Sequence, residues 1–226
     1  MKITWLGQAG LLFEINDKKV VIDPYLSNSV AKIQPNNYRR KPIDERFLKI
    51  KPKVIILTHN HADHTDLETL NYYLNNDSSV LVLASYNAWN EVRKFGGLKN
   101  NYVSFNSGTT WSLNGVSFRA VYAEHSDAFA IGVVISACGK NVYVTGDTLY
   151  SEKVFDSLKK AKIETCFLPI NGVGNNMNAI DANKFCKRVK AKINVPIHYG
   201  LFDEIDATTI DLPNKKCLEM YKEYEF

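Results

Sequence analysis

The stretch of sequence that decides the fold runs from Lys53 to His64 and reads K-V-I-I-L-T-H-N-H-A-D-H. Its first half is a short apolar run, which is typical of a buried strand. Its second half gathers three of the chain's five histidines and one aspartate within residues 59–64. Neutral imidazole and carboxylate are the donors that borderline divalent metal ions prefer. We therefore predict a metal-binding loop here; the alternative is a solvated polar loop that merely contains three histidines.

A strand enters this loop and a helix leaves it. The strand is expected over residues 53–58, and Thr65 to Glu68 has the T-x-x-E pattern of a capping box with Thr65 as the N-cap. Leu67, Leu70 and Leu74 then follow at helical spacing. The histidine run is thus predicted to join a strand to a helix, which is the context that a metal-binding motif of this kind requires.

The rest of the chain alternates short apolar runs with turn residues, which predicts an α/β fold. A helix is expected over residues 86–95, and a second one begins at the N-cap Asn178 and reaches about Lys190. Residues 24–52 contain four prolines and predict a long irregular excursion. Further strands are expected at Ile3–Leu6, Leu11–Ile15, Lys19–Ile22, Val80–Ala84, Val116–Tyr122, Ile131–Ser136, Val142–Thr145, Cys166–Ile170 and Ile193–Ile197.

The composition narrows the classes of function. The chain has 226 residues, 45% of them hydrophobic and 23% charged, so it can bury a substantial core as a single domain over 1–226. Its 28 basic and 24 acidic residues leave a formal charge of +4. That excess is too small to indicate a nucleic-acid partner. No apolar run approaches the roughly 20 residues of a membrane span, so we expect no membrane partner.

The four cysteines predict a reducing compartment. Cys138, Cys166, Cys186 and Cys217 are far apart, form no C-x-x-C pair and lie among apolar residues. Buried reduced thiols are therefore expected rather than disulfides or zinc ligands. The chain enters an alternating pattern at its start, without a charged and apolar leader. We accordingly expect a soluble, cytoplasmic protein. The three tryptophans Trp5, Trp89 and Trp111 are expected in the core.

Further polar residues follow other predicted strands and are weaker signals when taken singly. His125 and His198 could each be ordinary core or surface histidines. Asp147, in T-G-D-T, could be a turn aspartate, and Asp23 could simply hydrogen-bond to the backbone. Since strand ends in an α/β sheet can meet on one rim, their recurrence after strands favours a shared site.

With these motifs the chain resembles the metallo-β-lactamase-fold hydrolases. The resemblance rests on the H-N-H-A-D-H run, on His125 in A-E-H-S-D, on Asp147 in T-G-D-T and on His198 in P-I-H-Y-G, in the order the family has them. The segments W-L-G-Q-A-G, I-D-P-Y and L-P-I-N-G-V-G-N-N look most like the branch that includes L-ascorbate-6-phosphate lactonase. The resemblance implies a four-layer αβ/βα sandwich that carries two divalent metal ions.

The resemblance also implies a ligand set and a cofactor. His59, His61 and His125 would bind one metal, Asp63, His64 and His198 would bind the other, and Asp147 would bridge the two. Nitrogen and oxygen donors without a thiolate suit zinc, manganese or iron. Asp63 and Asp147 would be the catalytic carboxylates, since Asp63 can also orient the attacking water or accept its proton. Asp23 would hold a ligand imidazole in the right tautomer from behind.

The expected activity is hydrolysis of a small lactone or ester, including a phosphorylated sugar lactone, by a metal-activated water. Phosphodiester hydrolysis of a small substrate and a metal-binding sensor without turnover remain the alternatives. Arg39 and Arg40 could bind an anionic group or form a solvated face. Asn175 and Asn176 could contact substrate or simply form a turn. The expected partner is a small-molecule substrate, and a homo-oligomer stays open.

Overall fold

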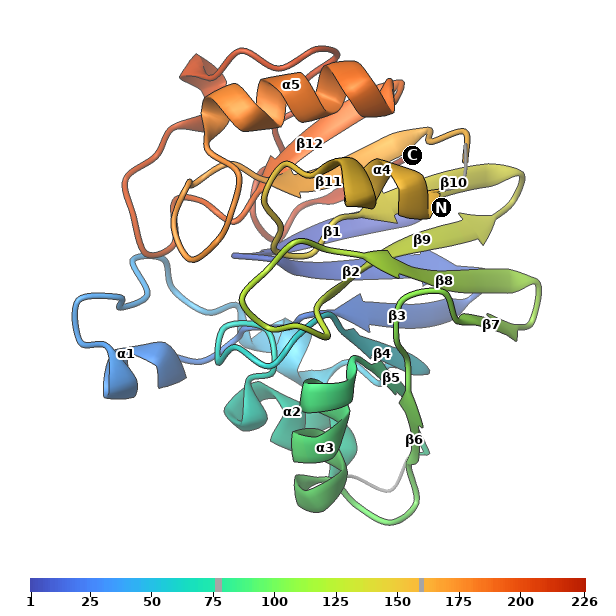
Figure 1. The fold of residues 1–226 in the computed structure, drawn as a ribbon. Helices are drawn as coiled ribbons and strands as arrows, with labels where there is room; N and C mark the ends of the chain where they lie inside the picture. The colour runs from blue at the N-terminus through green and yellow to red at the C-terminus, as the bar shows by residue number, and fades with distance from the viewer. Residues whose placement is uncertain (76–78, 159–160) are drawn as a thin grey trace. The chain divides into compact units, whose positions relative to one another are not determined.

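The computed structural model describes residues 1–75, 79–158 and 161–226 (Figure 1). The chain divides into two compact units, each made of segments that contact one another. Unit 1 contains Met1–Phe105, Gly200–Glu204 and Glu219–Phe226, and unit 2 contains Asn106–Tyr199 and Ile205–Leu218. Each unit has one sheet and its own helices, so the predicted mixed α/β class is confirmed. The prediction of a single domain over 1–226 stays a prediction.

Unit 1 is built on a seven-stranded sheet of order β13-β1-β2-β3-β4-β5-β6. The first three strands form an antiparallel meander, whereas β3 to β6 run parallel. Parallel neighbours need crossover connections. The helix α2 (Leu67–Leu74) connects β4 to β5 and α3 (Tyr86–Phe95) connects β5 to β6, while the 24–52 excursion connects β3 to β4. The strands are β1 (Lys2–Gly7), β2 (Gly10–Ile15), β3 (Lys18–Ile22), β4 (Val54–Leu57), β5 (Leu81–Ala84), β6 (Asn101–Ser104) and β13 (Glu223–Glu225).

The helices α2 and α3 lie on the same face of this sheet (Figure 1). Leu70 and Tyr73 of α2 pack with Ala88 and Val92 of α3 in one buried apolar cluster, which also contains Val82 of β5. All five side chains are fully buried. The buried Leu70, Val82 and Val92 side chains each stabilise the unit by about 1.5–3 kcal/mol. This packed face fixes the position of β4, whose Ile55 and Leu57 belong to the same cluster.

The excursion at residues 24–52 is mostly irregular, as predicted, but it contains two short helical segments. These are α1 (Ser29–Ile33) and the 3₁₀ helix η1 (Glu45–Lys49). The excursion is fastened to α2, because Tyr73 Oη donates to the carbonyl of Phe47 at 2.7 Å and Leu26 N–H donates to Thr69 Oγ1 at 2.8 Å.

Unit 2 repeats the same design with a six-stranded sheet of order β12-β11-β10-β9-β8-β7. Strands β7 to β10 form an antiparallel meander, and β10, β11 and β12 run parallel. The helices are α4 (Glu152–Leu158) and α5 (Ala179–Val189). The strands are β7 (Thr110–Leu113), β8 (Val116–Tyr122), β9 (Ile131–Ala137), β10 (Lys140–Val144), β11 (Thr165–Pro169) and β12 (Ile193–Ile197).

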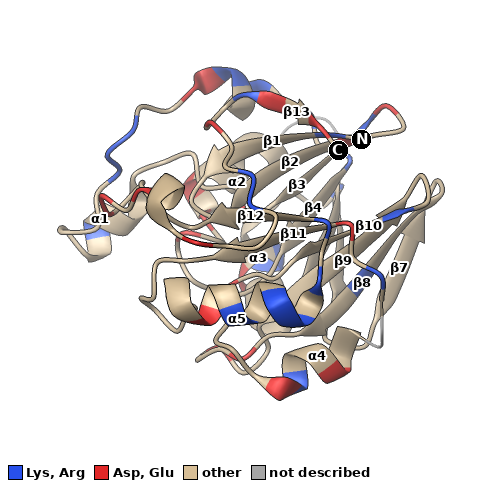
Figure 2. Cartoon of the chain, turned by 90° about the horizontal axis from the view of Figure 1, so that it is seen from above, with Lys and Arg blue, Asp and Glu red and all other residues tan. Residues whose placement is uncertain are grey.

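The helix α5 shows how local sequence sets an element in unit 2. Asn178 is the N-cap, as predicted, and its side chain accepts from Asp181 N–H at 3.0 Å. The helix carries an acidic residue in its first turn and the basic pair Lys187 and Arg188 in its last, which Figure 2 shows as red and blue at its two ends. Both signs match the helix dipole. Lys190 then ends the helix in the left-handed conformation.

Three expectations need correction. The N-cap of α2 is Asp66, not Thr65: the Asp66 carboxylate accepts from Glu68 and Thr69 N–H groups, while Thr65 Oγ1 donates to the His59 carbonyl. Trp5 is buried as expected, but Trp89 and Trp111 are only partly buried.

The third correction concerns the cysteines. Cys166 and Cys186 are buried, as predicted, whereas Cys138 is exposed and Cys217 is half-buried. Cys138 is exposed because it forms a two-residue hairpin turn with Gly139 between β9 and β10, and both residues have positive φ, 52° and 73°. Such tight turns require left-handed residues at the tip of a hairpin.

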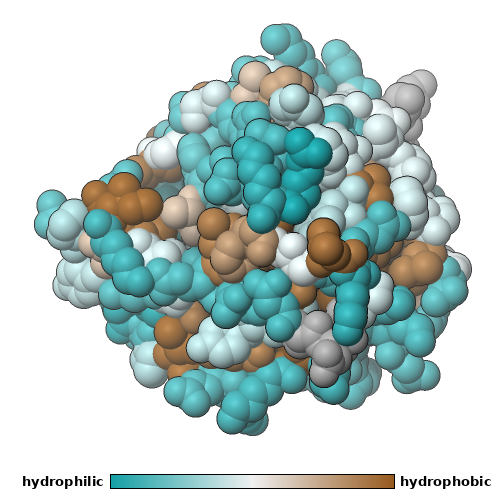
Figure 3. All heavy atoms as spheres, turned by 90° about the horizontal axis from the view of Figure 1, so that it is seen from below, coloured by the Kyte–Doolittle hydropathy of each residue, from teal (hydrophilic) through white to brown (hydrophobic). Residues whose placement is uncertain are grey.

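Within the described parts of the chain, no helix has the length and apolar character needed to cross a membrane. Figure 3 shows that the apolar patches on the face it presents are small and separated by hydrophilic side chains.

Candidate metal centre

The histidine loop of unit 1 is a compact turn between β4 and α2. The His61 carbonyl accepts from the N–H groups of both His64 and Thr65, at 3.0 and 2.8 Å. This folds the loop back on itself, so that the His59 ring lies 4.6 Å from the His61 ring and 4.0 Å from the His64 ring between centroids. The structure therefore brings together the three imidazoles that the sequence predicted as ligands.

Asp23 holds this loop from behind. Its Oδ1 accepts from Thr58 N–H at 2.8 Å, and its Oδ2 lies 2.5 Å from Thr58 Oγ1 and 2.8 Å from His64 Nδ1. Thr58 Oγ1 is also 3.1 Å from His59 Nδ1. The Thr58 hydroxyl donates its one hydrogen to Asp23, so toward His59 it can act only as an acceptor. His59 Nδ1 must therefore carry the proton of this hydrogen bond. Both histidines are then held in the tautomer that presents Nε2 as a ligand. The role that we predict for Asp23 stays a prediction, but this contact is the one it requires.

Asp63 is the fourth predicted ligand in unit 1. Its Oδ2 accepts from Gln8 Nε2 at 2.9 Å and lies 3.8 Å from His64 Nε2. Its side chain is 16% exposed, whereas His64 is fully buried. A carboxylate oxygen 3.8 Å from a histidine nitrogen is suitable for binding a cation together with it.

Unit 2 brings together Asp147, His198 and Asn176. Asp147 follows β10 and His198 follows β12, so each stands where a strand ends. His198 Nε2 is 3.2 Å from Asp147 Oδ2, and Asn176 Nδ2 donates to the same oxygen at 2.9 Å. All three residues are buried. His198 has φ of 60°, a conformation that few residues other than glycine adopt. Such strain concentrates at functional sites.

His125 lies in the loop after β8 of unit 2. Its Nδ1 accepts from Asp127 N–H at 3.1 Å, and its Nε2 is 3.2 Å from the Gly174 carbonyl. The ring thus contacts the 171–176 loop, which also carries Asn176. Asn175, by contrast, is exposed and has φ of 68°, so its backbone forms a turn of this loop.

The predicted substrate residues Arg39 and Arg40 lie in the excursion of unit 1 and contact protein groups there. Arg39 donates to the Tyr25 carbonyl at 2.9 Å and to Tyr221 Oη at 2.5 Å. Arg40 donates to the Phe202 carbonyl at 3.2 Å and lies 3.3 Å from a Glu204 carboxylate oxygen. Arg39 therefore fastens the excursion to another segment of unit 1, and the substrate role of both arginines stays a prediction.

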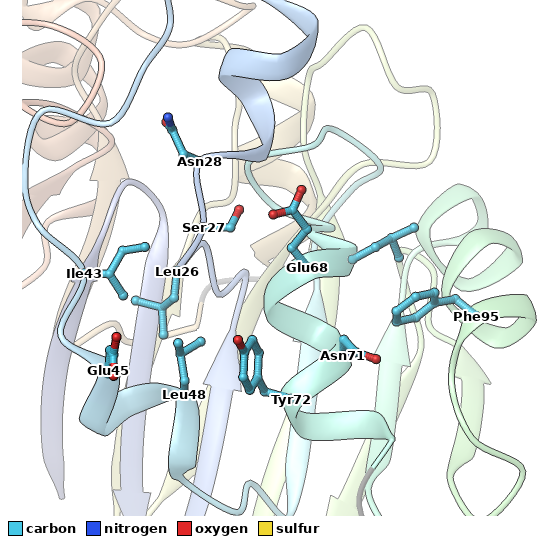
Figure 4. A pocket seen from close by; sticks show the side chains of 11 residues that line it. Leu26, Ser27, Asn28, Ile43, Glu45, Leu48, Glu68, Asn71, Tyr72 and Phe95 are labelled. Carbon is cyan, nitrogen blue, oxygen red and sulfur yellow. The ribbon is translucent and has the colours of Figure 1, made fainter.

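Unit 1 also has a groove of ≈ 630 Å³, and its lining residues include no histidine. Ile43, Leu26 and Leu48 gather on one side of this groove, and Tyr72 lies beside them (Figure 4). None of the predicted ligands lines it. Its carboxylate Glu68 is paired with Lys32 at 2.5 Å.

Three contacts of this site are not predicted by the sequence: those of Gln8 with Asp63, of Thr58 with Asp23 and His59, and of Asn176 with Asp147. Gln8 is not among the candidate residues of the sequence, although its contact with Asp63 is direct, and Thr58 is predicted only as the end of a strand. Thr58 immediately precedes the histidine run, and its hydroxyl was the available signal. For Gln8 the local signal is weak, because it lies 55 positions from Asp63 in the sequence.

Comparisons with known proteins identify the family and the fold of this chain. Residues 18–199 match the β-lactamase superfamily domain. A UPF0173 metal-dependent hydrolase of Staphylococcus epidermidis is 31% identical over 224 residues, which cover 91% of this chain and 89% of that relative. Among solved structures, a metallo hydrolase from Ignicoccus hospitalis superposes with a TM-score of 0.78 at 20% identity, over 100% of this chain and 98% of that one. CmlA, a diiron β-hydroxylase from Streptomyces venezuelae, gives 0.71 at 16% identity, over 92% and 48%.

The two structural neighbours show the fold, and the sequence matches show the class, a metal-dependent hydrolase of the β-lactamase superfamily. Within that class the chain belongs to the UPF0173 family of metal-dependent hydrolases. The predicted resemblance to metallo-β-lactamase-fold hydrolases is thus confirmed. Both units contain His and Asp side chains that are candidate metal ligands. They are His59, His61, Asp63 and His64 in unit 1, and His125, Asp147 and His198 in unit 2.

Proposed function

We propose that this protein is a binuclear metal-dependent hydrolase that opens a small lactone or ester, with phosphorylated sugar lactones as the first class to test. The observation that carries the proposal is the Asp23, Thr58, His59 and His64 network. It fixes two histidines of the loop in the tautomer in which Nε2 is the nitrogen that can bind a metal.

The donor set fits a pair of divalent ions. In this proposal His59, His61 and His125 would hold one metal, and Asp63, His64 and His198 would hold the other. Asp147 would contribute its carboxylate to both. All seven donors are imidazole nitrogens or carboxylate oxygens, which suits zinc, manganese or iron. The neighbour CmlA is named a diiron protein, which supports the proposal that this fold can carry two metals.

When bound, the metals would supply a Lewis acid and a water that is deprotonated near neutral pH. The protein's own residues have the remaining tasks. Asp63 orients the attacking water and accepts its proton. Asp147 would supply negative charge that offsets part of the metals' positive charge. No serine elbow of the G-x-S-x-G type and no cysteine next to a histidine occurs in the sequence, which favours direct attack by water over a covalent intermediate.

The partner in this proposal is a small molecule. The formal charge of +4 is modest for a protein of 226 residues and counts against a long nucleic-acid substrate. The charged groups around the excursion, including Arg39 and Arg40, are the proposed contacts for an anionic group on the substrate, and Asn175 is a further candidate contact.

Metal analysis of protein purified without chelator, combined with a substrate screen, tests the proposal. We expect about two metals per chain and hydrolysis of lactones that stops after chelation and returns when metal is added back. Turnover of phosphodiesters alone would assign the phosphodiesterase alternative. Two bound metals without turnover of any lactone, ester or phosphodiester would favour a sensor. A fully active metal-free preparation would end the proposal.

A further inference from the structure

Each unit holds one candidate carboxylate ligand by a buried side-chain amide. In unit 1 Gln8 Nε2 donates to Asp63 Oδ2 at 2.9 Å, and in unit 2 Asn176 Nδ2 donates to Asp147 Oδ2 at 2.9 Å. Gln8 is 2% exposed and Asn176 is 4% exposed. An ionised carboxylate can only accept, so the NH₂ group of each amide must face it.

The backbone around Gln8 is built to aim this amide. Gln8 follows Gly7 at the end of β1, and both have positive φ, 49° for Gln8 and 93° for Gly7. Trp5 Nε1 donates to the Gln8 carbonyl at 2.9 Å, which holds the Gln8 backbone in place. A glutamine in the left-handed region is uncommon, and the surrounding contacts must hold it there. This left-handed backbone directs the Gln8 side chain toward Asp63, whereas an extended residue that continued β1 would direct it elsewhere.

Asn176 is fixed in a comparable way. The next residue, Met177, is buried, its N–H donates to the Thr148 carbonyl at 3.0 Å, and its own carbonyl accepts from Gly172 N–H at 3.1 Å. These bonds tie the 171–176 loop to the segment that carries Asp147. The Asn176 side chain therefore has little freedom to leave the Asp147 carboxylate.

We infer that Gln8 and Asn176 are positioning residues that hold Asp63 and Asp147 as metal ligands. This inference rests on the proposed function. A neutral amide suits the task, because it fixes the carboxylate by a hydrogen bond without placing a positive charge beside the metal. The Gln8 amide acts on a ligand of one metal, whereas the Asn176 amide acts on the bridge. Loss of Gln8 therefore weakens one binding step, and loss of Asn176 weakens both.

The experiment measures the two stepwise dissociation constants for zinc by chelator competition, and for cobalt by its visible spectrum. Gln8→Met, which keeps length and removes the donor, should weaken one step by about 10- to 100-fold. Asn176→Leu should weaken both steps by a similar factor. Gln34→Met is the matched control, since Gln34 is an exposed glutamine in unit 1 that contacts Asn37. It should bind metal like the wild type.

Thermal unfolding of the metal-free proteins separates positioning from a merely structural role. A structural role lowers the metal-free melting temperature and leaves the dissociation constants of the folded protein unchanged. If Gln8→Met does not fold, Gln8→Ala replaces it, because alanine fits any space that glutamine leaves. Folded Gln8 and Asn176 variants with wild-type constants for both steps would overturn the inference while the proposed function stands. Wild-type protein that binds no zinc or cobalt would end both.

Discussion

Asp23 and His64 are 41 residues apart in the sequence and 2.8 Å apart in the structure, between Oδ2 and Nδ1. Both are fully buried. Asp23 has φ of 43°, so the chain turns sharply just after β3 to place this carboxylate against the histidine loop. The same carboxylate binds the backbone and hydroxyl of Thr58. The Asp23 side chain therefore holds both Thr58, at the end of β4, and the His64 imidazole in place.

Replacing Asp23 by asparagine should weaken metal binding while leaving the fold largely in place. Asparagine keeps the size of the side chain, but its amide can donate toward His64 Nδ1 and stabilise the wrong tautomer. We expect about a 10- to 100-fold loss in metal affinity, the range observed when such supporting partners are changed. Titration with zinc against a competing chelator measures it. Asp17→Asn, in an exposed turn of unit 1, is the control. Equal affinities in the two variants would contradict this role of Asp23.

The two proposed metal positions should respond to different histidines. His61→Ala should lower the metal content by about one ion per chain through the first position, and His198→Ala by about one ion through the second, since each removes one of three terminal donors. Cys217→Ser should leave metal content and hydrolysis nearly unchanged, because Cys217 belongs to neither set. Elemental analysis with activity assays provides the test. Full metal content in both histidine variants, with loss of activity in the cysteine variant, would show that the assignment is wrong.

Removal of the metals should lower the melting temperature. A ligand that binds only the folded state stabilises it by mass action, by about 2.7 kcal/mol when its free concentration is 100 times its dissociation constant. The measurement is thermal unfolding with chelator, followed by a series of added zinc concentrations. The melting temperature should rise with zinc concentration in the wild type and much less in His61→Ala. A melting temperature that changes neither with chelator nor with added zinc would count against any metal site.

Much of the local structure could be predicted because its signals are short-range. The helix α3 was expected at Tyr86–Phe95 and has those bounds, and Asn178 caps α5 as predicted. By contrast, β6 and β13 were missed, because β6 is a short strand with mostly half-buried residues and β13 has three residues. Both owe their strand conformation to the neighbours with which they pair, not to their own pattern.

The site shows the same limit. The proximity of the side chains of 59–64 was predictable because the motif is local. The contact of Asp23 with the loop was expected from its place at a strand end. The amide contacts of Gln8 and Asn176 depend on how distant segments meet. Asp66 rather than Thr65 is the N-cap of α2, because the Thr65 hydroxyl donates to the His59 carbonyl. Periodicity carries no information about such long-range choices.

The two arginines of the excursion should differ in their effect on stability. Arg39 is half-buried and makes two guanidinium hydrogen bonds, so Arg39→Gln should lower the free energy of unfolding by about 1–3 kcal/mol. Arg40 is exposed, and its ion pair with Glu204 is largely in solvent, so Arg40→Gln should change it by less than about 0.5 kcal/mol. Urea unfolding gives both values. If Arg40 instead binds substrate, Arg40→Gln should raise the KM for an anionic lactone and change that for a neutral lactone much less.

The cysteines should differ in reactivity and in their effect on stability at high pH. Burial raises the pKa of the Cys186 thiol from 9.0 to about 12 and raises that of Cys166 well above its ordinary value. The thiolate is the reactive form, so a disulfide reagent at pH 8 should modify the exposed Cys138 first and reach the two buried thiols only after unfolding. Peptide mapping after short exposure identifies the modified residue.

The raised pKa of Cys186 also predicts the sign of a pH effect. Between about pH 9 and pH 12 the unfolded chain has lost this proton and the folded chain still holds it. Stability therefore falls as pH rises through this window, whereas below pH 9 both states are protonated and the thiol has no effect. Cys186→Ala should make the decline in the free energy of unfolding shallower above pH 9 than in the wild type. Parallel declines in the two proteins would show that other groups account for the loss.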